Sequence, residues 1–217
     1  MYGLLVIAAL TAFAVRAFQV DTEGPEDAPH KIGNKITQLW AIAHHGLREN
    51  KFVRAEKALL TILKIDQKNA PAYNRLGILY AKQREYKDAI DCFEIASSIE
   101  PSASSLHNLG LIYYETGSYE KAMTAFEQAL SLETGLAARH IAFAKVLEKI
   151  GNDKRMIEEL EKAAELEPNK ETYNLLLRAF ETRGMEKEAH EIEKKIKNLI
   201  VPSGKPQRVI RPRRVVI

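Results

Sequence analysis

The stretch that decides the fold is Arg75–Pro101, RLGILYAKQREYKDAIDCFEIASSIEP. Its apolar residues recur at the spacing of an amphipathic helix, yet Gly77 lies inside that pattern and Pro101 ends it. A glycine within a helix costs about 0.5–1 kcal/mol relative to alanine. Gly77 therefore predicts a packing constraint that only a small residue meets, such as a second helix crossing at close range.

The same pattern returns further along the chain in Asn108–Thr134, NLGLIYYETGSYEKAMTAFEQALSLET. Seven residues match at one single offset: Leu76 with Leu109, Gly77 with Gly110, Tyr80 with Tyr113, Tyr86 with Tyr119, Ala89 with Ala122, Phe93 with Phe126, and Ala96 with Ala129. A fixed period of this size is typical of stacked helical repeats. We therefore predict that Gly77 and Gly110 are packing residues, each met by an alanine of the following helix, Ala89 or Ala122.

Weaker matches extend the period in both directions along the chain. Ala55 stands one period before Ala89, and Gly151 stands one period after Gly117. The pattern predicts five units, each a helix, a short turn and a second helix, at about residues 36–69, 70–102, 103–136, 137–169 and 170–202. Gly117, Gly151 and Gly184 are expected to be left-handed residues just past a helix end.

These repeated residues resemble the tetratricopeptide repeat (TPR) family. The resemblance covers roughly residues 36–200 and is most specific in the second and third units. It implies an all-α fold, a right-handed α-solenoid of about five helix-turn-helix units. The first unit departs from the family pattern, with Ala43 in the place of the glycine and Gly46 in the place of the tyrosine. The last helix is very polar, which suits a terminal cap.

The resemblance also implies a binding surface. In the family, the first helix of each unit lines a concave groove that holds peptide segments or partner helices. Carried over to this chain, the groove candidates are Asn74, Ile78, His107, Leu111, Tyr114, Ile141, Lys145, Asn174 and Arg178. The apolar members would form a central strip, the amides and the histidine would bond a peptide backbone, and Lys145 and Arg178 would meet acidic side chains. The family's clamp for chaperone tails is not expected, because Ala138 and Ala142 stand where it needs cations.

The sequence gives little support to catalysis. None of the six histidines lies at a metal-ligand spacing, and the single cysteine, Cys92, rules out a cysteine zinc cluster. The glycines form no phosphate-binding loop, and carboxylates alternate with lysines as on solvated helix faces. We expect a non-enzymatic protein without metal or cofactor. Cys92 is expected to be a buried structural thiol, and His140 a semi-buried structural residue.

Residues 1–20, MYGLLVIAALTAFAVRAFQV, contain no acid and one basic residue, Arg16. As a helix the segment would span about 30 Å, the thickness of a bilayer's hydrocarbon core. We interpret it as a single transmembrane anchor, joined to the repeats by a flexible linker at residues 21–35. The alternative is a cleaved signal peptide, because Ala12–Ala14 resembles a small-residue cleavage site. Basic residues follow the apolar segment, so the repeats should face the cytoplasm.

The last fifteen residues, 203–217, are predicted to be a disordered tail. They hold five cations and no acid, which leaves a charge of −2 for the rest of a chain whose net charge is +3. The repeats therefore have no basic bias, which disfavours nucleic acid as their partner. The tail's basic patch consists of Lys205, Arg208, Arg211, Arg213 and Arg214. Contact with anionic lipid is the second interpretation of this patch; weak nucleic-acid contact and strand addition to a partner are others.

Taken together, the sequence predicts a membrane-anchored, non-enzymatic TPR scaffold that binds a protein or peptide partner in its groove. Two alternatives stay open. One is a secreted or periplasmic repeat protein that has lost a signal peptide and acts in envelope assembly. The other is a regulatory subunit of a membrane enzyme.

Overall fold

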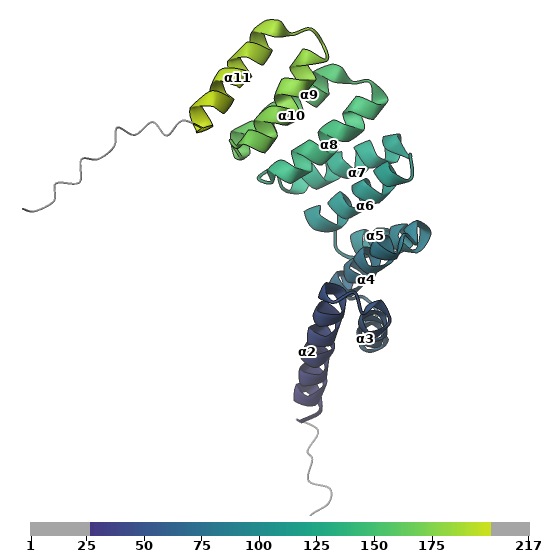
Figure 1. Cartoon of the computed structure of the whole chain (residues 1–217). Helices are drawn as coiled ribbons and strands as arrows, with labels where there is room; N and C mark the ends of the chain where they lie inside the picture. Colours follow the sequence, from purple (N-terminus) through teal and green to yellow (C-terminus); the bar gives the residue numbers. More distant parts are fainter. Residues whose placement is uncertain (1–26, 201–217) are drawn as a thin grey trace, which may run out of the picture.

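The structure, a computed structural model, describes residues 27–200, which form ten α-helices and no β-strand within that range. The helices are α2 (Asp27–Arg48), α3 (Phe52–Ile65), α4 (Ala70–Gln83), α5 (Tyr86–Ile99), α6 (Ala103–Glu115), α7 (Tyr119–Leu132), α8 (Ala137–Ile150), α9 (Asp153–Leu166), α10 (Lys170–Glu181) and α11 (Glu186–Ile200). Figure 1 shows them stacked in chain order along an elongated array from α2 to α11. The predicted all-α solenoid is confirmed.

The helices pair as predicted, each unit packing its first helix against its second: α2 with α3, α4 with α5, α6 with α7, α8 with α9, and α10 with α11. The first helices of units two to five begin at residues 70, 103, 137 and 170, which are the predicted starts of those units. One boundary differs: α2 begins at Asp27, so residues 27–35 are helical and not part of a flexible linker. The composition of the stretch, which includes Pro29, predicted a linker. Proline is nevertheless tolerated in the first turn of a helix.

The predicted transmembrane anchor at residues 1–20 and the tail at residues 203–217 lie outside the described residues. Within residues 27–200, no helix is both long enough and apolar enough to span a bilayer.

Side chains of the connecting segments start several helices. Asn69 accepts a hydrogen bond from the backbone N–H of Ala72 at 3.0 Å, and Asn169 forms a reciprocal capping box with Thr172. Turns within the units use left-handed residues. Gly117, Gly151 and Gly184 have φ angles of 74°, 81° and 68°, which confirms their predicted role. The first two units instead place Asn50 and Arg84 in this conformation, with φ angles of 56° and 64°.

Gly77 and Gly110 lie where two helices cross at close range. A Cβ atom on Gly77 would lie 2.7 Å from Cε1 of Phe93, and one on Gly110 would lie 2.8 Å from Cε2 of Phe126. Both glycines are therefore packing residues, as predicted. The atoms nearest to the two Cβ positions belong to these phenylalanines and not to the predicted partners, Ala89 and Ala122. The rings of the two phenylalanines occupy the space that the glycines leave, and each alanine lies one turn earlier on its helix.

The neighbouring units fill the same crossing with a different pair of residues. The places of Gly77 and Phe93 recur, at the same spacing along the chain, as Ala43 with Leu59 in unit one and Ala144 with Leu160 in unit four. All four of these residues are buried. Alanine on the first helix, larger than glycine, thus accompanies leucine on the second, smaller than phenylalanine. The total side-chain volume at the crossing therefore changes little.

Tyrosines tie consecutive units together. The Tyr80 hydroxyl donates a hydrogen bond to Glu56 of the preceding unit at 2.9 Å, and Tyr113 donates in the same way to Glu94 at 2.5 Å. Cys92 is buried between units one and two, and burial raises the pKa of its thiol to about 11. The predicted structural thiol is confirmed.

A polar pair is buried at the junction of units three and four. His140 and Glu159 are 4% and 5% exposed, and Nδ1 of the histidine lies 2.6 Å from Oε2 of the glutamate. Its Nε2–H donates to the carbonyl of Thr134 at 2.9 Å, and Lys162 donates to Oε1 of Glu159 at 2.7 Å. The expectation of a semi-buried structural His140 is confirmed, with fuller burial than predicted.

The pair has a local structural role. The segment 133–136, which joins units three and four, contains no proline, whereas the connections before and after it have Pro101 and Pro168. His140 holds the carbonyl of Thr134, and the buried Arg139 pairs with the carboxylate of Glu133 at 3.1 Å. Side chains of α8 thus hold the connecting segment 133–136 in place, although that segment contains no proline to restrict its backbone.

The glycine crossing can be tested by exchanging the residue pairs of two units. We expect Gly77→Ala to lower the free energy of unfolding by about 1 kcal/mol, because overpacking costs about 1–3 kcal/mol and alanine recovers up to about 1 kcal/mol of helix propensity. Gly77→Ala with Phe93→Leu, the pair found in units one and four, should restore the lost stability. Chemical denaturation measures both.

Gly33→Ala is the control, because a Cβ on this exposed glycine of α2 would meet nothing within 4 Å. It should stabilise the protein by up to about 1 kcal/mol. A Gly77→Ala variant that gains as much stability as Gly33→Ala would contradict the close crossing.

The buried polar pair makes a second prediction. Glu159→Ala should cost about 3 kcal/mol, because it leaves the ring of His140 buried without its partner. The double variant His140→Leu with Glu159→Ala copies the equivalent residues of unit three, Leu106 and Ala125, and should stay within about 1 kcal/mol of the wild type. Thermal and chemical unfolding would report both values. Costs that simply add in the double variant would show that the two side chains do not act as a pair.

Candidate functional site: the concave groove

The first helices of the units line one face of the solenoid. α4 contacts α6, and α6 contacts α8, whereas the second helices of neighbouring units make no contact of that extent in the described chain. The first helices therefore lie on the inner, more tightly curved side. The nine residues predicted for the groove all lie on α4, α6, α8 and α10.

The nine predicted residues differ in exposure. Leu111, Lys145, Asn174 and Arg178 are exposed or half-exposed at the surface, while the other five are half-buried: Asn74, Ile78, His107, Tyr114 and Ile141. None is fully buried, so each retains some accessible surface. The most accessible residues come from α6, α8 and α10, so the open part of the groove lies over units three to five.

An amide pair bridges the first helices of units two and three. Nδ2 of Asn108 donates to Oδ1 of Asn74 at 3.4 Å. Asn108 was not among the predicted groove residues, although its place one repeat after Asn74 signals the equivalence. Each amide has further hydrogen-bonding capacity, so the pair can donate to and accept from an extended backbone.

His107 is held against the core rather than free in the groove. Its ring meets the ring of Phe126 edge-on, with 5.5 Å between centroids, and its Nδ1 is buried. Burial, and then the nearby guanidinium of Arg139, lowers the pKa of His107. At pH 7 it is therefore a neutral imidazole and adds no positive charge to the groove.

Fewer apolar side chains of the predicted strip are open to a partner than the sequence predicted. Tyr114 is half-buried, with its ring tilted against Tyr119 at 5.8 Å between centroids. Ile78 and Ile141 are likewise half-buried against the core. Leu111, which is 37% exposed, is the apolar residue of the strip that is most open to a partner.

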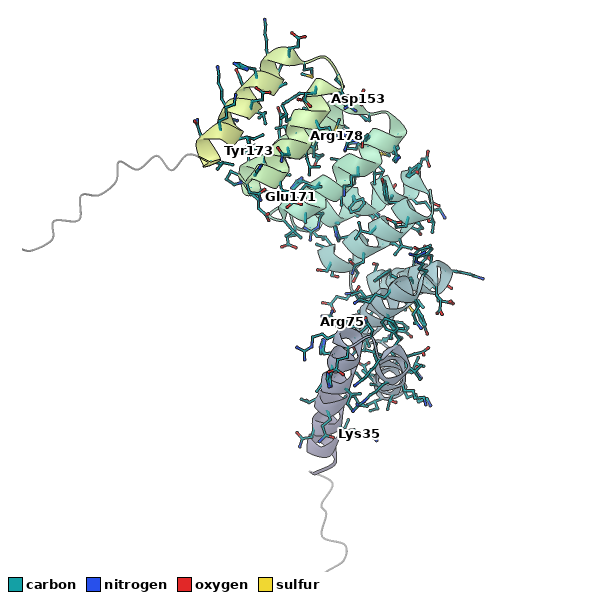
Figure 2. The ribbon with its side chains drawn as sticks, viewed as in Figure 1. Lys35, Arg75, Asp153, Glu171, Tyr173 and Arg178 are labelled. Atoms are coloured by element: carbon teal, nitrogen blue, oxygen red, sulfur yellow. The ribbon has the colours of Figure 1, made fainter. Side chains whose placement is uncertain are left out.

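A hollow of about 400 Å³ opens between α8, α9 and α10. It joins three of the predicted residues, Ile141, Lys145 and Arg178, and adds Leu175, which was not predicted to bind a partner. Figure 2 labels Arg178 on α10, with Asp153 nearby.

The charges around this hollow are unevenly paired. Arg183 forms an ion pair with Asp153 and also donates to the carbonyl of Ala179. Lys145 and Arg178, in contrast, make no ion pair with any described residue. The carboxylate of Glu148 also lines the hollow and is likewise unpaired within the described chain, so two cations and one acid face the solvent here. The excess of positive charge beside Ile141 and Leu175 suits an acidic side chain carried by an otherwise apolar segment.

The remaining predicted site, the basic patch of residues 205–214, lies outside the described residues. Within residues 27–200, no group of histidine, cysteine, aspartate and glutamate side chains is arranged to hold a metal ion.

Comparison with known proteins addresses the repeat type directly. A sequence model of the tetratricopeptide repeat matches residues 68–133, and a second one matches residues 139–170. A search of curated proteins found no match. Among solved structures, the chain is similar to a crystal structure of MamA, with 25% identity and a TM-score of 0.65 over 71% of this chain and 91% of that one.

Two further solved structures share the fold. MamA from Desulfovibrio magneticus RS-1 is 18% identical, with a TM-score of 0.67 over 76% of this chain and 95% of that one. YrrB, described as a TPR protein with an unusual peptide-binding site, is 20% identical, with a TM-score of 0.61 over 74% and 84% of the two chains. The chain therefore contains tetratricopeptide repeats, and its helix pairs form an α-solenoid of the TPR type.

Proposed function

We propose that this chain is a non-catalytic scaffold whose concave groove binds an extended segment of a partner protein. The observation that carries the proposal is the hollow beside α8 and α10, where Lys145 and Arg178 lie unpaired with any described residue, next to Ile141 and Leu175. The TPR fold and its similarity to YrrB, a TPR protein with an unusual peptide-binding site, support the proposal.

The residues along the groove define the chemistry of the partner. Asn74 and Asn108 bond its backbone, Leu111 packs against an apolar side chain, and Lys145 with Arg178 binds an acidic one. A partner segment that satisfies all three is extended, with an apolar residue over unit three and an aspartate or glutamate over units four and five. Charge-assisted hydrogen bonds at the acidic position supply much of the specificity.

We also propose that residues 1–20 attach the scaffold to a membrane, with the repeats on the cytoplasmic side. Attachment would act by effective concentration: a partner held in the groove stays near a process at the membrane without any additional contact. The apolar composition of residues 1–20 supports this part of the proposal.

Selection from a random peptide library displayed on phage tests the groove without knowledge of the natural partner. Peptides selected by the wild-type chain should be enriched in aspartate and glutamate. Lys145→Glu with Arg178→Glu should remove that enrichment, because two cations become two anions. Sequencing of the selected pools measures the effect.

The matched control is Lys154→Glu with Lys187→Glu, which changes the net charge equally at two exposed lysines outside the hollow. It should select the same acidic peptides as the wild type. If the Lys145 and Arg178 variant also selects those peptides, the hollow is not the binding site.

A further inference from the structure

The solenoid has an open face at its N-terminal end. In unit two, Leu76 and Cys92 pack against unit one. The residues at the equivalent places in unit one, Ile42 and Ala58, have no described unit before them. Figure 1 shows α2 and α3 at this end of the array. A hollow of about 810 Å³ lies here, and its apolar lining includes Leu39, Ile42, Phe52 and Val53.

This end face carries positive charge where the next unit carries negative charge. Three cations line the hollow: Lys51, Arg54 and Lys57. At the equivalent places in unit two, one repeat later, stand Glu85, Asp88 and Asp91. The charge is thus reversed at all three positions. The end face of unit one therefore differs in charge from the equivalent surface of unit two.

Two of the three cations are free to meet a ligand. Lys51 pairs with Glu49 at 2.6 Å, whereas Arg54 and Lys57 make no ion pair with a residue in the described range. Val53 lies beside them and is 63% exposed. Lys35, labelled in Figure 2 near the beginning of α2, is exposed and lies one turn before Leu39, on the same side of that helix. The face therefore combines cations with exposed apolar side chains.

Two polar residues make this face unfavourable for a covering helix. His45 and Gln38 are exposed in unit one, although the equivalent residues of unit two, Leu79 and Ala72, are fully buried. A helix packed here would have to desolvate both polar side chains, which is unfavourable without new hydrogen bonds. Water and lipid headgroups, in contrast, keep them hydrated.

Charge disfavours residues 2–20 and a second copy of the chain as occupants of the face. Residues 2–20 are mostly apolar and contain no acid to meet Arg54 and Lys57. A second copy presenting the same face would oppose like charges. An anionic lipid surface suits both the cations and the exposed apolar side chains of the end face. It attracts the cations and accepts apolar side chains at the level of the headgroups.

We propose that the end face formed by α2 and α3 docks on anionic lipid headgroups, with Val53 and its apolar neighbours in the interfacial layer. This inference rests on the membrane attachment proposed for residues 1–20. Only residues 21–26 separate that segment from α2, and a chain of that length reaches about 20 Å at most. An attached chain thus brings the end face within reach of the bilayer and fixes how the groove is presented.

A fluorescent probe at the end face tests the contact in the full-length chain. Cys92→Ala removes the only cysteine and copies the alanine that units one and three have at that place, Ala58 and Ala125. An environment-sensitive dye is then attached through Val53→Cys, and in the matched control through Lys87→Cys, the equivalent and exposed place of unit two. The chains are mixed with vesicles of neutral phosphatidylcholine, alone or with anionic phosphatidylglycerol, and flotation records attachment separately.

The expected result is flotation with both kinds of vesicle, and a blue shift with quenching by brominated lipid at residue 53 only when phosphatidylglycerol is present. The probe at residue 87 should not respond. Arg54→Asp with Lys57→Asp, which installs the residues of unit two, should abolish the shift. Lys149→Asp with Lys154→Asp, at exposed lysines of unit four, should leave it intact.

The outcomes separate the two proposals. Flotation without a shift at residue 53 overturns the docking face and leaves membrane attachment standing. Failure to float with neutral vesicles overturns attachment by residues 1–20, and the docking face then stands only if flotation with phosphatidylglycerol depends on Arg54 and Lys57. A probe at residue 53 that is already shielded without vesicles means that protein covers the face, which overturns the inference.

Discussion

The close crossing of two helices within units one to four is the constraint on which the rest of the structure depends. In units two and three a phenylalanine ring fills the space above a glycine, and in units one and four a leucine accompanies an alanine. Because interiors pack at nearly constant density, the two solutions keep the helices at comparable separation. Each unit then offers its neighbour a surface of similar shape, and this regularity lets the units stack into one solenoid.

Stacking of this kind also creates the groove. Since first helices approach one another on the inner side, their outward residues converge from four different units onto a single surface. No unit holds the site alone: the amide pair spans α4 and α6, and the cations of the hollow come from α8 and α10. A local change in one crossing would therefore shift binding groups relative to one another, although it lies beneath the groove and touches no partner.

The repeat period allowed most of the fold to be predicted from sequence. Periodicity located the helix pairs and the left-handed glycines, because both recur at fixed places in the units. It could not show that the ring of Phe93 lies nearer to Gly77 than Ala89 does, since both residues recur with the same period. It also missed the helical start of α2, which lies before the repeating part. The sequence likewise could not predict the partner of His140, because Glu159 resembles the other carboxylates of a solvated helix. Only the structure shows that it is buried against the histidine.

For the site, the period identified the groove helices but not which side chains stay accessible. The repeat register does not show whether the ring of His107 is free in the groove or packed on the ring of Phe126. Photocrosslinking in cells tests the groove most directly, with a photoreactive residue in place of Leu111 and a control in place of Lys87 on α5. If the concave groove binds a partner, position 111 gives a discrete crosslinked protein and position 87 gives none. Equal, diffuse crosslinking at both positions would contradict the claim that the concave groove is the binding surface.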